Sequence, residues 1–123
     1  MTEILINPVA KPRMTQRDKW SKRPCVMKYW AFKDALVAMT NLKQFVLEDR
    51  YGVFFYIEMP KSWSKKKRAL MIGQPHQQKP DLDNLLKSVN DCLKKEDASI
   101  YEIEASKAWW DEGKIVFYNL RKY

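Results

Sequence analysis

Histidine, cysteine and glycine are scarce in this 123-residue sequence, which contains one, two and three of them respectively. The single histidine, His76, argues against zinc sites and catalytic triads that need several histidines. Cys25 and Cys92 have no CxxC spacing, so we expect a reducing compartment and two thiols in ordinary core packing.

Long apolar runs are also missing. No stretch approaches the roughly 20 residues that cross a bilayer, and residues 1–6 lack the basic and apolar regions of a secretory signal. We therefore expect a cytoplasmic protein, in a bacterium or a host cell, with no membrane association.

Acidic residues are outnumbered, because 15 Asp and Glu stand against 23 Lys and Arg, a formal charge of +8. Such a surplus on a small chain favours a polyanionic partner, either nucleic acid or an acidic membrane. The alternative is that the charge only keeps the protein soluble. With 46% hydrophobic and 31% charged residues, the composition is globular, and the length fits a single domain over residues 1–123.

Hydrophobic periodicity predicts six main elements. The predicted helices are 27–46 and 81–93, and the predicted strands are 4–9, 53–59, 100–109 and 114–120. Residues 10–24 are predicted as a loop, and the basic segment 61–80 allows a short helix capped by a serine. The turn 111–113 predicts a hairpin between the last two strands. The order β-α-β-(basic loop)-α-β-β predicts an α+β fold, a small mixed β-sheet with two main helices packed on it.

Most aromatic residues are assigned to packing. We expect Trp30, Phe45, Phe54 and Phe55 in the core. Trp109 and Trp110 are expected on opposite faces of their strand, where one of them would be suited to contact a partner subunit.

The acidic residues with the most distinctive spacing are Asp81 and Asp83, which follow Pro80 at the start of the second long helix. One such aspartate is usually a helix cap, but the two cannot both be the N-cap, and a third carboxylate follows at Asp97. Hard divalent ions such as Mg²⁺ prefer oxygen ligands. Lys87 lies four residues after Asp83, so it forms either an ordinary ion pair or a cation beside a reacting phosphate.

Two basic segments are suited to the phosphate backbone of DNA. Trp20 and Trp63 lie inside them, and we expect each to pack against its own loop, with stacking on unpaired bases as the alternative. The predicted DNA-binding residues are Lys11, Arg13, Arg17, Lys19, Lys22, Arg23, Lys65, Lys66, Lys67 and Arg68.

The stretch from Lys79 to Lys87, Lys-Pro-Asp-Leu-Asp-Asn-Leu-Leu-Lys, with Asp-Cys-Leu at 91–93, resembles the signature of RusA-type Holliday junction resolvases. Residues 96–100 resemble the second acidic element of that family, although Glu96 stands where an aspartate is usual. Lys107 falls near a basic residue that often follows, and the loop at 11–13 is also similar. The resemblance covers most of the chain and depends mainly on residues 79–100.

The resemblance implies a homodimeric, Mg²⁺-dependent endonuclease that makes paired nicks in branched, four-way DNA, with Mn²⁺ expected to substitute. Asp81, Asp83 and Asp97 would bind metal, and Lys87 would assist catalysis. Family members are frequent in bacteriophages and prophages. Two rival functions remain, a DNA-binding protein without catalysis and a less selective flap or single-strand nuclease.

The third metal ligand depends on geometry, because the connection from Leu93 to Asp97 is shorter than is usual in the family. At about 1.5 Å per residue, Leu93 lies roughly 15 Å along the helix from Asp83. Asp97 can return only if the helix stops near Leu93 and the chain reverses at residues 94–95. Otherwise Glu102 or Glu104, on the returning strand, becomes the better third ligand.

Overall fold

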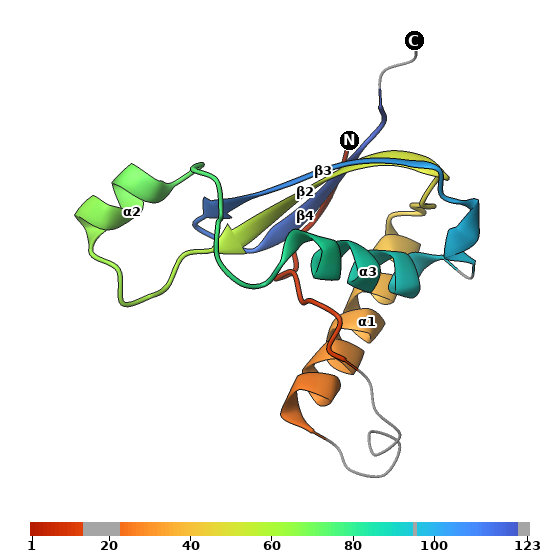
Figure 1. The fold of residues 1–123 in the computed structure, drawn as a ribbon, viewed down its shortest axis with the longest axis horizontal. Coiled ribbons are helices and arrows are strands. Elements are labelled where there is room, and N and C mark those ends of the chain that lie inside the picture. Colours follow the sequence, from red (N-terminus) through yellow and green to blue (C-terminus); the bar gives the residue numbers. More distant parts are fainter. Residues whose placement is uncertain (14–22, 95, 121–123) are drawn as a thin grey trace.

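The computed structural model describes residues 1–13, 23–94 and 96–120, and the side chain of Asp97 lies outside the described part. Four strands form one sheet, and α1 and α3 lie together on one side of it (Figure 1). This is the predicted α+β fold with a small mixed sheet. The elements, in chain order, are β1 (Thr2–Ile4), α1 (Pro24–Leu42), β2 (Arg50–Glu58), α2 (Lys65–Met71), α3 (Leu82–Leu93), the 3-10 helix η2 (Asp97–Ser99), β3 (Glu102–Trp110) and β4 (Lys114–Tyr118).

The strand order is β1-β4-β2-β3, with β2 parallel to β3 and antiparallel to β4. The predicted hairpin is therefore wrong: β3 and β4 are consecutive, but β2 lies between them. The side chains fit this order, because Ile115, Val116 and Phe117 are all buried, as in a strand with a neighbouring strand on each side, here β1 and β2. β3 carries charged residues and takes the sheet edge, where charge is tolerated.

Helical spacing predicts that α1 buries the face that carries Trp30, Ala31, Ala35, Leu36, Met39 and Leu42, but of these six only Leu36 is fully buried. Its buried residues are Val26, Tyr29, Phe32, Leu36 and Thr40. Trp30 is 39% exposed, so its assignment to the core is wrong. Apolar residues surround this helix on several sides, and periodicity therefore did not select the correct face. Cys25 is also exposed, contrary to prediction, whereas Cys92 is half-buried.

The C-terminal end of α1 comes earlier than predicted, at Leu42. Gln44 adopts a positive φ of 54°, a conformation that ends a helix. The chain then turns back, and the Phe45 N–H donates to the Thr40 carbonyl at 2.9 Å. Phe45 stacks on Phe117 with ring centroids 4.8 Å apart, so it joins the core as predicted, although from outside the helix.

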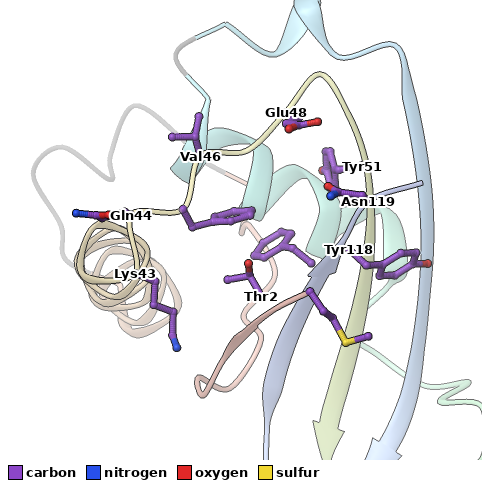
Figure 2. A pocket seen from close by; sticks show the side chains of 11 residues that line it. Thr2, Lys43, Gln44, Val46, Glu48, Tyr51, Tyr118 and Asn119 are labelled. Carbon is purple, nitrogen blue, oxygen red and sulfur yellow. The ribbon is translucent and has the colours of Figure 1, made fainter. Parts of the chain in front are cut away.

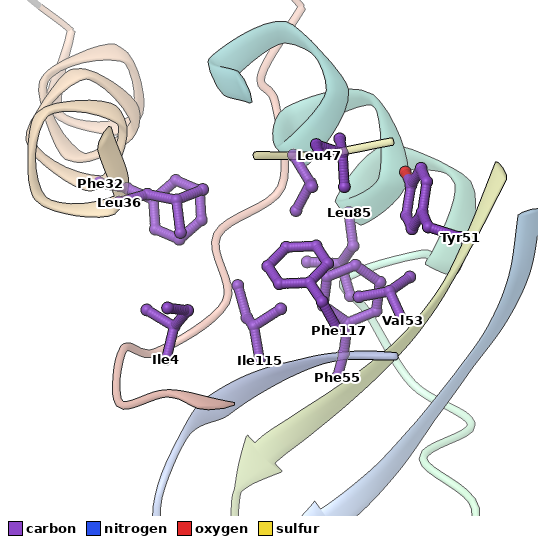
Figure 3. Packing of buried hydrophobic residues seen from close by; sticks show 11 residues of the cluster. Ile4, Phe32, Leu36, Leu47, Tyr51, Val53, Phe55, Leu85, Ile115 and Phe117 are labelled. Carbon is purple, nitrogen blue, oxygen red and sulfur yellow. The ribbon is translucent and has the colours of Figure 1, made fainter. Parts of the chain in front are cut away.

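The core lies between the helices and the inner face of the sheet (Figure 3). Leu85 and Val89 of α3 are buried there, and Leu82, Leu86 and Leu93 pack against it. Helical spacing predicts one apolar face of these same five residues, and the structure confirms it. The residues at the centre of this packing are Ile4, Leu36, Val53, Phe55 and Ile115, each fully buried.

The outer face of the sheet carries a smaller aromatic group. Phe54 stacks on Tyr56 with centroids 4.4 Å apart, and Trp110 meets Tyr56 edge-on at 5.2 Å. Phe54 is thus outside the core, contrary to prediction, because neighbouring strand residues point to opposite faces. Trp109 and Trp110 do face opposite ways, and Trp109 is buried. Among the described residues, no helix is long and apolar enough to span a bilayer.

Candidate active site at the start of helix α3

Asp81 and Asp83 are exposed at the beginning of α3. Asp81 occupies the N-cap position with extended backbone, but its side chain makes no capping hydrogen bond. Among the described residues, the Oδ1 atom of Asp83 accepts a hydrogen bond only from the next backbone N–H, that of Asn84, at 2.9 Å. Helix capping therefore does not explain the carboxylate of Asp81, and the side chain of Asp83 is exposed.

Lys87 is exposed one turn further along α3. Within the described part of the chain it makes no ion pair with Asp83, so the ordinary i,i+4 pair is not what this spacing produces here. Both side chains are left available to a ligand on the same face of the helix. Among the described residues, ion pairs form between Lys11 and Asp91, Arg50 and Glu102, Lys94 and Asp49, and Lys114 and Glu3.

The segment before Asp81 is fastened to the edge strand β3. Gly73 N–H donates to the Trp109 carbonyl at 2.8 Å, and His76 N–H donates to the Lys107 carbonyl at 3.2 Å. The Lys107 ammonium donates to the carbonyls of Gln78 and Pro80, at 2.7 Å each. The Lys79–Pro80 peptide bond is cis. β3 thereby sets the position from which α3 and its aspartates begin.

His76 is a packing residue in this segment. Its ring lies edge-on to Trp109 with centroids 4.4 Å apart, and its Nδ1 atom is buried without a hydrogen-bond partner. Burial, assisted by the nearby Lys107 ammonium, lowers the pKa of His76. The neutral imidazole is therefore the favoured form, as the aromatic contact suggests.

The backbone of Asp97 lies at the other end of α3. The helix stops at Leu93, as the short connection required, and η2 follows it, while Lys95 lies outside the described residues. A helix of this length spans about 18 Å, which separates η2 from Asp81 within one protomer. Two hydrogen bonds support this separation. Tyr101 N–H, just after η2, donates to the Asp49 carbonyl at 2.9 Å. Pro80, just before α3, is bound by Lys107, which lies about 20 Å from Tyr101 along the chain direction of β3.

Glu102 and Glu104 do not replace Asp97. Ile103 and Ala105 pack against the core, and residues on either side of them point to the opposite face of the sheet, away from α3. Glu102 is also paired with Arg50 there. Neither glutamate of β3 lies on the side of Asp81, so the predicted substitute ligands are excluded within one protomer.

The acidic groups that one protomer assembles here fit an open Mg²⁺ site but not a closed one. Among the described side chains, no cluster of three acidic, histidine or cysteine residues gathers to enclose a metal ion. Mg²⁺ needs fewer protein ligands than that, because it commonly takes one or two carboxylates and completes its shell with water and phosphate oxygens. Asp81 and Asp83 supply that number.

Residues 61–72 of the predicted basic segment 61–80, which we call the basic arm, project beyond the end of the sheet and contain α2 (Figure 1). Ser64 caps α2 as predicted, accepting from Lys67 N–H at 3.2 Å. The rings of Trp63 and Trp109 are tilted by 56° with centroids 4.8 Å apart, and the Lys67 ammonium lies 4.3 Å from the centre of the Trp63 ring. Trp63 therefore packs within the protein, although its ring partner Trp109 belongs to β3 and not to the loop of Trp63.

The charges on the basic arm are not equally free. Lys65 and Lys66 are exposed, and their side chains make no hydrogen bond, ion pair or ring contact in the described part of the chain. Arg68 donates to the Pro60 carbonyl at 2.9 Å, so it holds the base of the arm, and Lys67 is engaged with Trp63. Lys65 and Lys66 are the members best placed to meet phosphate.

The other predicted DNA-binding residues precede α1. The ammonium of Lys11 pairs with Asp91 of α3, which fixes the N-terminal segment across that helix. Arg13 is exposed, and its carbonyl accepts from the Arg23 guanidinium at 2.8 Å. Arg17, Lys19, Trp20 and Lys22 lie outside the described residues.

A cavity of about 240 Å³ opens at the end of the sheet where β2 begins (Figure 2). Thr2, Tyr51 and Tyr118 line it, and Glu48 is its only acidic residue. One carboxylate is too few to hold a hard cation without phosphate. None of the described residues that line this cavity belongs to α3, so it is separate from the carboxylates at the start of that helix.

The family model described as "Endodeoxyribonuclease RusA" matches residues 6–117, which include both aspartates, Lys87, the basic arm, β2, β3 and all of β4 except its last residue, whereas β1 precedes the match. No curated protein matches the chain in sequence. The extent of the family match, over nearly the whole chain, shows that this protein belongs to the RusA endodeoxyribonuclease family.

Proposed function

We propose that this protein is a Mg²⁺-dependent, structure-selective endodeoxyribonuclease that resolves four-way DNA junctions by paired phosphodiester hydrolysis. One observation carries the proposal. Asp81 and Asp83 stand exposed, without any ion pair in the described residues, at the start of α3 in a chain of formal charge +8. In a basic protein that only held DNA, two such carboxylates would weaken binding unless a cation offset them.

The residues take distinct roles in this proposal. Asp81 and Asp83 hold the divalent ion, with Mn²⁺ able to substitute. When bound, such an ion activates water and stabilises the departing oxygen. Lys87, exposed and without a partner in the described residues, stabilises the negative charge that grows on the scissile phosphate. Lys65 and Lys66 of the basic arm hold the phosphate backbone of the DNA.

A homodimer is part of the proposal. The backbone of Asp97 lies beyond the far end of α3, about 18 Å from the first turn of the helix, so Asp97 and Asp81 of the same protomer are far apart. A second copy related by two-fold symmetry is able to supply that residue, and it also provides the two cutting sites that a near-symmetric junction needs. We propose that the protein acts in DNA recombination and repair, in a bacterial or phage-infected cytoplasm.

The test is cleavage of labelled four-way junction, flap, linear duplex and single-stranded DNA, with and without Mg²⁺ or Mn²⁺. We expect metal-dependent cutting of the junction at symmetric positions. Binding of every branched substrate without cutting would favour a non-catalytic DNA-binding protein. Equal cutting of all four substrates would favour a general nuclease.

A further inference from the structure

Lys107 occupies a position that the strand pattern assigns to the protein interior. Its neighbours on the inner face of β3 are Ala105, which packs against the core, and Trp109, which is buried. A lysine at such a position needs partners for its ammonium, because burying a charge without them is costly. Lys107 finds them in the carbonyls of Gln78 and Pro80, both at 2.7 Å.

Those two carbonyls belong to the last residues before Asp81. The preceding part of the segment is tied to β3 by backbone hydrogen bonds at Gly73, Gln74 and His76. After His76, within the described residues, no backbone hydrogen bond to another element holds the chain until α3 begins. The Lys107 ammonium is therefore the last tether on the connection that delivers Asp81.

We propose that Lys107 is a positioning residue for the metal-binding carboxylates: by gripping the two carbonyls it fixes the connection, so that Asp81 and Asp83 are held ready for the cation. This inference rests on the proposed function, since it concerns the same carboxylates. Preorganisation of this kind strengthens binding, because the ordering of the loop is already complete before the ligand arrives.

The charge of the Lys107 ammonium has a separate, electrostatic effect on metal affinity, which is opposite in sign to the effect of positioning. A positive charge near two carboxylates repels a divalent cation, so removing that charge alone should tighten metal binding. Losing the hydrogen bonds from Lys107 to the connection should instead weaken metal binding. The sign of the change in metal affinity therefore separates positioning from simple electrostatics, and a role only in global stability predicts no change in the folded variant.

The experiment measures Mn²⁺ binding to the DNA-free protein by titration calorimetry or electron paramagnetic resonance. We expect Lys107→Met to weaken Mn²⁺ binding at least threefold and Lys107→Arg, whose guanidinium also donates to two acceptors, to recover most of it. The matched control is Lys114→Met, because Lys114 pairs with Glu3 on the outer face of the sheet, at 2.9 Å. The control should bind Mn²⁺ as the wild type does.

Equal or tighter Mn²⁺ binding by Lys107→Met would overturn the proposal. If Lys107→Met does not fold, Lys107→Gln is used instead, since the neutral glutamine side chain is too short to reach both carbonyls. Hydrogen exchange gives a second measure without metal. The Leu85 N–H, which donates to the Asp81 carbonyl at 3.1 Å, should exchange faster when the tether is lost, and unchanged exchange would also contradict the proposal.

The result can be told apart from a failure of the proposed function. Junction cleavage by the wild type tests the nuclease, whereas metal affinity and exchange at Leu85 test the tether. If the wild type binds Mn²⁺ at Asp81 and Asp83 but cuts no DNA, the proposed nuclease activity is wrong, whereas the positioning role of Lys107 is still supported.

Discussion

At the scale of single residues, Asp83 is the group whose chemistry can be isolated most cleanly. Its only contact in the described residues is with the adjacent Asn84 N–H. Asp83→Asn keeps an acceptor for that bond and removes the charge. We expect an unchanged fold, equal or tighter junction binding, and cleavage slowed by at least about 100-fold, which corresponds to losing roughly 3 kcal/mol of transition-state stabilisation.

The measurement for Asp83→Asn is single-turnover cleavage of a labelled junction, beside binding by gel shift. Asp34→Asn is the matched control, because Asp34 is likewise exposed on a helix, and it should cut normally. Cleavage retained by Asp83→Asn would reduce that residue to a structural role.

Lys87 provides a second prediction. Because it forms no ion pair with Asp83, Lys87→Met should change the free energy of unfolding by less than about 0.5 kcal/mol. Cleavage should slow by on the order of 100-fold, the effect of losing one preorganised charge at a developing oxyanion. Urea unfolding and single-turnover kinetics measure the two quantities. A large loss of stability with normal cutting would assign Lys87 to the fold, and Lys33→Met on α1 is the control.

Residue spacing predicted the aspartates and the apolar face of α3, because these depend on local chemistry and on helical geometry alone. It did not predict what Lys107 does, since its partners at Gln78 and Pro80 come from a segment nearly thirty residues away. One signal was available. A charged residue placed between Ala105 and Trp109 on the inner face of a strand must find a long-range partner.

At the scale of elements, the basic arm is expected to contribute salt-dependent affinity without sequence preference. Each phosphate contact contributes about 0.9 to the slope of log affinity against log salt. Lys65→Ala with Lys66→Ala should therefore reduce that slope by up to about 2 and weaken binding of all DNA substrates alike. The change should leave the fold intact, since both side chains are exposed.

The comparison variant for the arm is Lys28→Ala with Lys33→Ala, which removes the same charge from α1. Fluorescence anisotropy from low to high salt gives the slope. If both double variants lower it equally, net charge is responsible and the arm has no special role.

The connection from α3 to β3 depends on Asp49. Its Oδ1 atom accepts from Lys94 Nζ and Ser99 Oγ, at 2.8 Å each, and these bonds, that from Lys94 first, lower the pKa of the carboxyl. A lowered folded-state pKa means that the stabilisation is complete above the unfolded value of about 4 and is lost as pH falls through the folded value.

Asp49→Asn should therefore be less stable than the wild type at neutral pH, and the difference should shrink as the pH falls below about 4. Urea unfolding across that range measures it. A difference that stays constant with pH would mean that the Asp49 charge does not contribute.

The predicted hairpin failed at this scale for a definable reason. Asp111 to Gly113 does reverse the chain, but a turn signal reports a reversal and not which strand becomes the neighbour. The run Ile115 to Phe117 is buried throughout, which fits an interior position between β1 and β2 better than a position at the sheet edge. Long-range pairing decided the order.

At the scale of the whole molecule, one protomer leaves its acidic groups divided between the two ends of α3. If the partner subunit supplies Asp97, then Asp83→Asn and Asp97→Asn proteins should each be inactive and should restore activity to each other when subunits exchange. Random exchange gives heterodimers in which one of the two sites is intact, so about a quarter of all sites recover. Such heterodimers should nick one strand of a junction instead of making paired cuts.

The experiment mixes the two variants in equal amounts, allows exchange, and measures nicked and resolved junction separately, while light scattering establishes the dimeric mass. The control is Asp34→Asn mixed with Asp83→Asn. This mixture must show resolution as well as nicking, because the Asp34→Asn homodimers keep two intact sites. No recovery after proven exchange would mean that each protomer needs its own Asp97. That residue would then have to travel about 18 Å along α3, which the tethering of its connection through Asp49 opposes. A monomeric mass would remove the shared site altogether.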